Sequence, residues 1–369
     1  GVGVGGPHAP YRQSERREIY LKYALQLVEA GWAYYAFDTA EELDALRREA
    51  EARGEAFAYN YAVREKLATS LALPAEEVKA RLDRGDQWVI RFRMPENETV
   101  AMDDLIRGHV EVNTSTLDDK VLYKSADALP TYHLANIVDD RLMEVSHVIR
   151  GEEWLPSLPK HLQLFRYLGF KPVKYMHIAQ LMRLDENGSK KKLSKRDMGA
   201  NLNDYERMGY APECVAEYVM TLLNSNFEEW HAQNADKSYL DFPFSIKKMS
   251  SSGCLFDFDK LNDVSKNVLS KLSADEIYKG TADWAKKFDP EFFALLDRAP
   301  EYAKSILAIG RGGKKPRKDF AVYADVRPYM DFFYDELFTP DYSYPENLQK
   351  EDIEKVLDIY PSVYDETKE

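Results

Sequence analysis

The chain has 369 residues, which is long enough for two or three domains with separate hydrophobic cores. Its 50 lysine and arginine residues are outnumbered by 63 aspartate and glutamate residues, so the formal net charge is −13. This charge argues against a protein that binds nucleic acid by bulk attraction, and any contact with RNA must use local basic patches.

The two cysteines, Cys214 and Cys254, have no neighbouring cysteine or histidine at a metal-ligand spacing. They therefore predict neither a disulfide framework nor a structural zinc site, and they favour the reducing cytoplasm. No apolar run approaches the length that spans a bilayer, so we expect no membrane partner.

The first thirty residues predict a loop and then one amphipathic helix. Glycine and proline dominate 1–10, as in a segment of turns. Ser14 is the expected N-cap of the helix, and Gly31 is expected to end it. The apolar residues that recur at helical spacing are Ile19, Tyr23, Leu27 and Val28.

Three further segments predict a small α/β insertion. Residues 41–53 carry Glu and Arg three and four positions apart, as in a solvated helix laced by ion pairs. Apolar and charged residues alternate toward the end of 88–94, and Pro95 follows. This pattern is typical of a strand that ends at a turn. We expect 104–113 to continue this insertion.

Strands and helices alternate after residue 120. The expected strands are 121–123, 131–138 and 145–150, and the expected helix is 155–167. This order is typical of a parallel α/β sheet, in which ligands bind beyond the carboxyl ends of the strands. Asn136, Arg150 and the segment 151–154 would lie at that edge.

The remainder is predicted to be mostly helical. The expected helices are 212–223, 274–287, 290–298 and 300–309, and 249–258 is expected to hold a loop and a strand. In the first helix, the core stripe is predicted to be Val215, Val219, Leu222 and Leu223, with Cys214 as a small neighbour. The basic loop 311–318 is either an exposed linker or an RNA contact.

The basic segment 190–196 is the most informative part of the chain. It holds five cations in seven residues and follows the glycine-containing turn 184–189. Such a flexible cationic loop is suited to closing on a triphosphate, although a solvated basic run would have the same composition.

Four segments in a fixed order resemble glutamyl-tRNA synthetase of the bacterial type, a class I aminoacyl-tRNA synthetase. Residues 192–196, KLSKR, are similar to the KMSKS signature of that class. The other three segments are YRQSER at 11–16, PTYHLANIVDD at 130–140 and HVIRGEEWL at 147–155. The resemblance covers residues 11 to 260.

The resemblance implies an α/β fold with the second half of a Rossmann-like parallel sheet, a small α/β insertion and a mostly α-helical C-terminal region. The implied domains are the end of the first half of the nucleotide-binding domain at 1–30, an inserted acceptor-stem-binding α/β domain at 31–120, the second half of the nucleotide-binding domain at 121–200, a stem-contact helical domain at 201–300 and part of an anticodon-binding helical domain at 301–369.

The implied reaction joins glutamate to ATP and then to tRNA. The glutamate carboxylate attacks the α-phosphate of ATP, and the resulting adenylate is transferred to the 3′ end of tRNA(Glu). Both steps build negative charge on oxygen, so positioning and cationic groups carry the catalysis. The implied partners are glutamate, ATP with Mg²⁺ and tRNA, with tRNA(Gln) left open; we expect no zinc and favour a monomer.

By the same resemblance, Lys192 and Lys195 grip the phosphates as catalytic residues, and Ser194 shapes the loop. Glu153 and Trp154 border the nucleotide. The residues assigned to glutamate are Tyr132, Asn136 and Arg150, since an arginine can fork onto a carboxylate.

Simpler roles remain open for several of these side chains. Tyr132 and Trp154 could be packing aromatics, and Arg150 could pair with Asp139 or Asp140. The histidines that an α/β core would hold, at His133, His147 and His177, fit no metal-ligand pattern and are expected to be structural.

The chain also departs from the family. It carries no HIGH motif before the first helix, so we expect a fragment that lacks the N-terminal part with that motif and the C-terminal end, and that is inactive alone. Segment 33–39 has no zinc-binding cysteines, and 262–267 differs from the usual sequence, which leaves the tRNA-stem contacts of that segment open. The alternatives are a glutaminyl-tRNA synthetase, a shorter tRNA-modifying transferase or a remnant that only binds RNA or protein.

Overall fold

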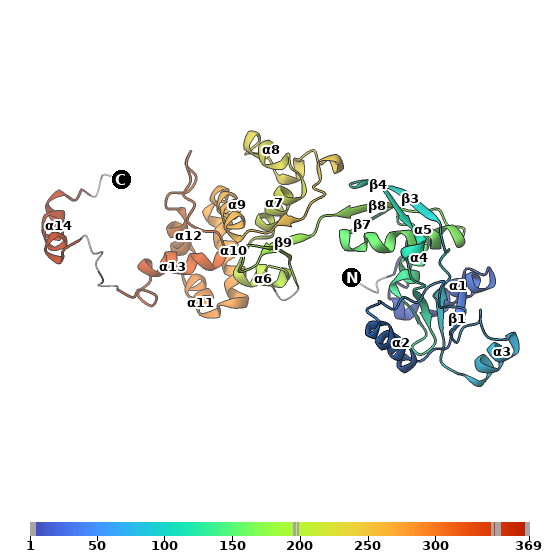
Figure 1. Ribbon diagram of the computed structural model, residues 1–369. Coiled ribbons are helices and arrows are strands. Elements are labelled where there is room, and N and C mark those ends of the chain that lie inside the picture. Colours follow the sequence, from blue (N-terminus) through green and yellow to red (C-terminus); the bar gives the residue numbers. More distant parts are fainter. Residues whose placement is uncertain (1–4, 195–196, 198, 341–342, 344–347, 366–369) are drawn as a thin grey trace. The chain divides into compact units, whose positions relative to one another are not determined.

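A computed structural model describes residues 5–194, 197, 199–340, 343 and 348–365. It divides into two compact units, which are described separately below. Figure 1 labels many of the helices and strands. The first unit comprises residues 1–193 and 220–256, and the second comprises 194–219 and 257–369. None of the described helices is long and apolar enough to cross a membrane.

The helices of the first unit are α1 (Arg17–Glu29), α2 (Ala40–Ala52), α3 (Ala75–Arg84), α4 (Tyr132–Leu142), α5 (Leu158–Tyr167) and α8 (Phe227–Gln233), with the 3-10 helix η3 at Glu152–Ser157. Its strands are β1 (Ala33–Ala36), β2 (Val89–Phe92), β3 (Thr99–Asp104), β4 (Gly108–Asn113), β5 (Val121–Lys124), β6 (Leu129–Pro130), β7 (His147–Gly151), β8 (Lys174–Ile178), β9 (Leu181–Leu184), β10 (Lys190–Lys192) and β11 (Cys254–Leu255).

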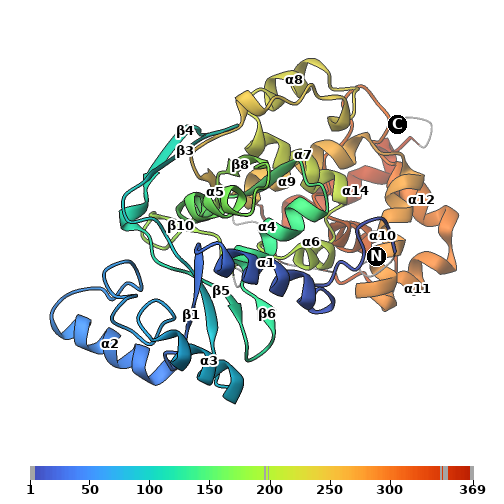
Figure 2. The same ribbon diagram turned by 90° about the vertical axis from the view of Figure 1, so that its right-hand side faces the viewer.

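The first unit is built on short sheets. Strands β1, β2, β5 and β6 form an antiparallel four-stranded sheet in that order. Helices α1 and α4 contact each other and lie along this sheet, as Figure 2 shows. Their buried side chains join those of the sheet and of α5 in one hydrophobic core.

Parallel pairing, which the sequence predicts for this part of the chain, occurs between β7 and β8 and between β9 and β11. The mixed α/β fold class is therefore confirmed. Strands β3 and β4 form a separate antiparallel hairpin that covers the segment 104–113 of the expected insertion.

The predicted strand 131–138 is wrong, because these residues form the first part of helix α4. Thr131 stands at the N-cap with extended backbone, and its hydroxyl donates to the Val121 carbonyl at 2.6 Å. The buried side chains recur at helical spacing and are Leu134, Ala135, Ile137 and Val138. Tyr132 and Asn136 share a face of this helix, since residues four apart are neighbours on a helix.

The N-cap predicted for the first helix is also wrong. Ser14 lies in the 3-10 helix Gln13–Glu15, and α1 begins after Arg16, which makes no side-chain cap. The Arg16 guanidinium instead donates to Asp139 at 3.0 Å and to the Pro10 carbonyl at 2.9 Å. The start of α1 is thereby fixed by a contact with α4.

The second unit is helical. Its helices are α6 (Leu202–Met208), α9 (Phe258–Lys271), α10 (Ala274–Phe288), α11 (Pro290–Arg298), α12 (Pro300–Ala308), α13 (Val326–Met330) and α14 (Lys350–Val363), with the 3-10 helix η6 at Tyr323–Asp325. Helix α10 packs against α11, α12 and η6 around one hydrophobic core. The helical C-terminal region that the sequence predicts is confirmed.

Helix α7 (Pro212–Leu223) has the predicted bounds but a different buried face. The side chains in its core face are Cys214, Glu217 and Tyr218, whereas Val219 is 36% exposed. One residue on a helix is a rotation of about 100°, so the stripe through Val215 and Val219 faces partly outward. Cys214 is a fully buried member of the core, where the sequence predicts only a neighbour.

Candidate functional site

Arg150 lies at the carboxyl end of β7, where ligands of parallel sheets bind. Its register partner on β8 is His177, so the two side chains point to the same face of the strand pair. Arg150 is only 8% exposed, and its guanidinium carbon lies 4.8 Å from the centre of the Tyr175 ring. A charged group this deeply buried requires partners that fix it.

Those partners are two histidines. Arg150 Nε donates to His177 Nε2 at 2.9 Å, and Nη1 donates to His161 Nδ1 at 3.0 Å. Because a guanidinium can only donate, both imidazole nitrogens must accept and neither can carry a proton. Burial lowers the pKa of His177 and, with the Arg150 charge, lowers the pKa of His161 well below its ordinary value.

Asp104, the last residue of β3, fixes the tautomer of His177. His177 Nδ1 donates to Asp104 Oδ2 at 2.7 Å, and both side chains are fully buried. Burial alone would raise the pKa of Asp104, but hydrogen bonds from His177 and from the backbone amides of Arg107 and Ile106 hold it below its ordinary value. The carboxylate is therefore ionised and acts as an acceptor.

His161 also forms a hydrogen bond with His133 on α4. Since Nδ1 of His161 accepts from Arg150, its Nε2 carries the proton and donates to His133 Nδ1 at 3.1 Å. Burial and the Lys160 charge lower the pKa of His133 to about 4. His133 and His177 are satisfied histidines, as the sequence predicts, while His147 is exposed and contacts Ser146.

Two of the residues predicted to bind glutamate carry a buried polar atom without a partner in the described part of the chain. These atoms are Arg150 Nη2 and Asn136 Oδ1. The first can donate to a carboxylate, and the second can accept from an ammonium group. An α-amino acid presents both groups.

The predicted alternative, an ion pair between Arg150 and Asp139, is wrong. Asp139 accepts instead from Arg16 and, at 2.7 Å, from the Tyr20 hydroxyl. Asp140 makes no ion pair with Arg150 over the described residues, although burial and the neighbouring Asp139 raise its pKa to about 6 while the Arg150 charge opposes this rise. Arg150 thus has no carboxylate partner among the side chains that the structure describes.

Tyr132 connects the glutamate set to the nucleotide set. Its ring, 44% exposed, lies 4.4 Å from the Trp154 ring and 6.0 Å from the His161 ring, measured between centroids. Trp154 belongs to η3, which begins directly after β7 and two residues after Arg150. The first turn of α4 and the end of β7 are therefore brought together by aromatic contacts.

Glu153 and Lys192, both predicted to contact the nucleotide, form an ion pair of 3.1 Å between η3 and β10. Glu153 also accepts from the Gln180 amide at 2.9 Å. Burial would raise the pKa of Glu153, but a backbone hydrogen bond, Gln180 and Lys192 lower it. The partner of Lys192 is therefore a solvent-exposed carboxylate, Glu153, on the same segment as Trp154.

The rest of the basic loop is described only in part. Lys195, the predicted catalytic cation, lies outside the described residues. Ser194 is exposed, and its backbone amide donates to Asp197 Oδ2 at 2.6 Å. Lys191 pairs with Asp185 at 2.9 Å across the β9–β10 hairpin, which fixes the start of the loop.

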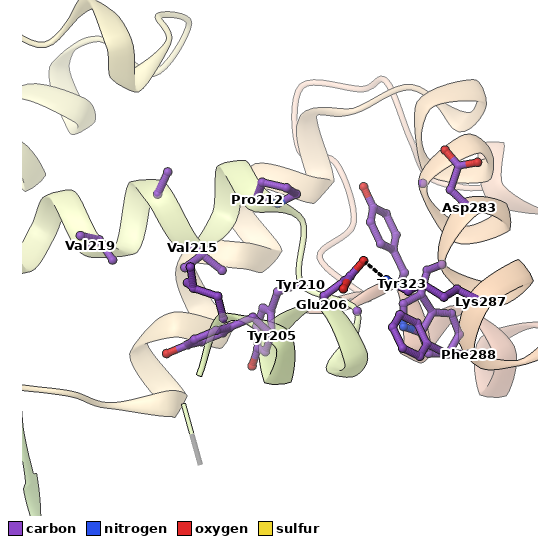
Figure 3. Close-up of a pocket in the computed structure, with 15 residues that line it drawn as sticks. Tyr205, Glu206, Tyr210, Pro212, Val215, Val219, Asp283, Lys287, Phe288 and Tyr323 are labelled. Carbon is purple, nitrogen blue, oxygen red and sulfur yellow. Dashed lines mark hydrogen bonds and ion pairs between the residues drawn. The ribbon is translucent and has the colours of Figure 1, made fainter. Parts of the chain in front are cut away.

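A separate cavity of about 670 Å³ lies within the second unit, between α6, α7, α10 and η6. Figure 3 shows Tyr205, Tyr210, Phe288 and Tyr323 around it, with an ion pair between Glu206 and Lys287 of 2.6 Å. None of the predicted site residues lines this cavity.

No local sequence pattern identifies Asp104 or His161 as part of the candidate site, and none connects His177 with Arg150. Asp104 lies in a hairpin that precedes Arg150 by 46 positions, and no local pattern connects the two. The one available signal was that a buried arginine at a strand end needs acceptors, and only the strand register identifies them.

Comparisons with known proteins identify the family to which the chain belongs. The family model described as tRNA synthetases class I (E and Q), catalytic domain, matches residues 3–263. A glutamate–tRNA ligase of Acetivibrio thermocellus is 45% identical, with 99% of this chain and 67% of the relative covered. One of Clostridium perfringens is 41% identical, covering 97% of this chain and 66% of the relative.

Solved structures give the same result. A glutamate tRNA ligase from Elizabethkingia meningosepticum, solved in complex with its amino acid, matches with a TM-score of 0.77 and 35% identity over 97% of this chain and 70% of that one. The chain spans about two thirds of the length of the curated relatives it matches. It belongs to the glutamate–tRNA ligases, within the class I aminoacyl-tRNA synthetases.

Proposed function

We propose that the protein activates glutamate with ATP and transfers it to the 3′ end of tRNA(Glu), and that Arg150 binds a carboxylate of the substrate. The observation that carries this proposal is a buried guanidinium without a carboxylate partner among the described side chains, with one nitrogen unpaired. A substrate carboxylate supplies the missing acceptors, and charge-assisted hydrogen bonds are strong where water is excluded.

Asn136 and Tyr132 complete the amino-acid pocket in this proposal. Oδ1 of Asn136, which has no hydrogen-bond partner among the residues that the structure describes, accepts from the substrate ammonium, and the Tyr132 ring covers the bound molecule. Both come from one face of α4, and Tyr132 is linked to Arg150 through His161. A pocket with one cation and one neutral acceptor suits an α-amino acid.

The nucleotide is proposed to bind beside Trp154 and Glu153. The Trp154 face can take an adenine ring, and Lys192 can exchange its pairing with Glu153 for a phosphate. Lys192, Ser194 and Lys195 then close on the triphosphate, with Lys195 stabilising charge on the oxygens as pyrophosphate leaves. ATP is taken with Mg²⁺, which its phosphates and water hold.

Several finer assignments are part of the same proposal. The division into a nucleotide-binding domain, an acceptor-stem-binding insertion, a stem-contact region and part of an anticodon-binding region follows the family resemblance. Recognition of tRNA(Gln) in addition to tRNA(Glu), a monomeric state and a cytoplasmic location stay predictions from the sequence.

ATP–pyrophosphate exchange with single amino acids, in the presence of tRNA, tests the function. The proposal predicts exchange with glutamate in the intact protein and none above background with glutamine or aspartate. Exchange that is equal with glutamine, or absent with glutamate, would contradict it.

A further inference from the structure

Arg150 is held in an unusual way for a buried cation. Most buried charges are paired with an opposite charge, but both acceptors that the described residues provide for this guanidinium are neutral imidazole nitrogens. Neutral acceptors fix the plane of the guanidinium without cancelling its charge. A protein carboxylate in the same place would compete with the substrate carboxylate.

We infer that Asp104, His177 and His161 are positioning residues that hold the Arg150 guanidinium in one orientation, so that its remaining donors receive the carboxylate of the amino acid. This inference rests on the proposed function, because it assigns a task to the residues behind a glutamate-binding arginine. It adds residues on β3, β8 and α5 to the site.

The order of the hydrogen bonds explains the need for Asp104. A neutral histidine has one N–H, and in His177 the Asp104 carboxylate keeps it on Nδ1. Nε2 is then an acceptor for Arg150 Nε. If the proton were on Nε2, two N–H groups would face each other at 2.9 Å, and the guanidinium would have to turn away.

Asp104 is itself held independently of Arg150. Its Oδ1 accepts from the backbone amides of Ile106 and Arg107, each at 2.9 Å, and its Oδ2 accepts from the backbone amide of His177 at 3.1 Å. The turn after β3 is thus built to orient this carboxylate. Arg107 adds a donation from its side chain to the His177 carbonyl at 3.2 Å.

The first test compares Asp104→Asn with Asp103→Asn in the intact protein. Both changes remove one carboxylate from β3, but Asp103 points to the opposite face, has a side chain that is 86% exposed and pairs with His109. The amide that D104N introduces can donate to Nδ1 of His177 and so favours the wrong tautomer. We expect D104N to raise the KM for glutamate about tenfold, the size of one lost hydrogen bond to a charged group, with kcat and the KM for ATP changed less than about twofold. D103N should behave as the wild type.

The second test uses His177. H177F keeps a ring beside Tyr175, where the two rings now stack with centroids 5.8 Å apart, but it removes the acceptor. It should raise the KM for glutamate at least as much as D104N, and H177Q should restore part of the affinity because its amide oxygen can accept. The double variant D104N/H177F should be no worse than H177F, since both changes break one chain of hydrogen bonds.

A measurement without substitution keeps the inference testable if these variants do not fold. With ¹⁵N-histidine, His177 should show a protonated Nδ1 and an unprotonated Nε2 at neutral pH, and folded D104N should shift this signature. An Nε2-protonated His177 in the wild type, or folded D104N and H177F with wild-type affinity for glutamate, would overturn the inference. If R150A weakens glutamate binding while those variants do not, the inference alone fails; if R150A also has no effect, the proposed function of the site fails with it.

Discussion

Arg150 and His177 are register partners on the parallel strands β7 and β8. Arg150 Nε donates a hydrogen bond of 2.9 Å to His177 Nε2, and this bond orients the guanidinium. The strand register gives the two side chains a common direction. The absence of a carboxylate partner for Arg150 among the described residues leaves its charge for a ligand.

In the intact protein, Lys195→Ala should abolish most of the aminoacylation while leaving glutamate affinity nearly unchanged. Removing a cation that contacts only the charge developing in the transition state lowers kcat by roughly 10²- to 10³-fold. Lys191→Ala is the matched control, because Lys191 belongs to the same basic loop but pairs with Asp185. Pyrophosphate exchange in the presence of tRNA measures both variants. A wild-type rate for K195A would show that Lys195 does not stabilise the phosphates in the transition state.

Asp140→Asn should stabilise the protein at pH 8 by a few degrees of melting temperature. Burial and the neighbouring Asp139 raise the pKa of Asp140 from 3.8 to about 6. A carboxyl with a raised pKa in the folded state favours folding below pH 4, and this contribution is lost as the pH rises through 6. The buried charge therefore costs stability at pH 8, and asparagine removes it.

Thermal unfolding of D140N and the wild type at pH 4 and pH 8 tests whether the substitution stabilises the protein only where Asp140 is ionised. The gain from D140N should shrink toward zero at pH 4, where the aspartic acid is already protonated. A gain of the same size at both pH values would show that the effect does not come from the charge of Asp140, and a loss at pH 8 would show that the folded protein stabilises the carboxylate.

Gly280→Ala should destabilise the second unit although alanine favours helices. A Cβ at Gly280, inside α10, would lie 2.2 Å from the Tyr323 ring, so one of the two elements must move. Overpacking of this kind costs about 1–3 kcal/mol, more than the helix propensity gained. Denaturant unfolding measures the change. In the background of Tyr323→Ala, which removes the ring, the same substitution should be neutral or stabilising; an unchanged cost there would locate the clash elsewhere.

Much of the fold could be predicted from sequence patterns. Helix α7 has the predicted bounds because Pro212 fixes its first turn, and α10, α11 and α12 follow from proline, capping residues and apolar spacing. Strand β7 is expected at its place because 145–150 contains the β-branched residues Val145, Val148 and Ile149. These signals are local, so a single sequence contains them.

The errors arose where a tertiary contact overrides the local pattern. Residues 131–138 contain Ile and Val and suggest a strand, but the packing of α4 on α1 and the sheet selects a helix. Ser14 is a good N-cap by type, yet the contact of Arg16 with Asp139 sets the start of α1 two residues later.

The sequence predicts only those residues of the candidate site that are proposed to face the ligand. Family resemblance supplied Tyr132, Asn136 and Arg150, and it offered no reason to choose Asp104 or His161. Those two act through Arg150 from β3 and α5, and their relation to it exists only once the strands are in register.

The most direct test is the glutamate affinity of Arg150→Ala in the intact protein, measured as the KM for glutamate in pyrophosphate exchange, with Arg141→Ala as a control. Arg141 is exposed at the end of α4, so its loss should not affect the pocket. We predict that R150A raises the KM for glutamate on the order of 10²-fold with little change in the KM for ATP, and that R150K recovers only part of the loss because lysine lacks the planar fork. A KM for glutamate in R150A equal to that of R141A and the wild type would contradict this prediction.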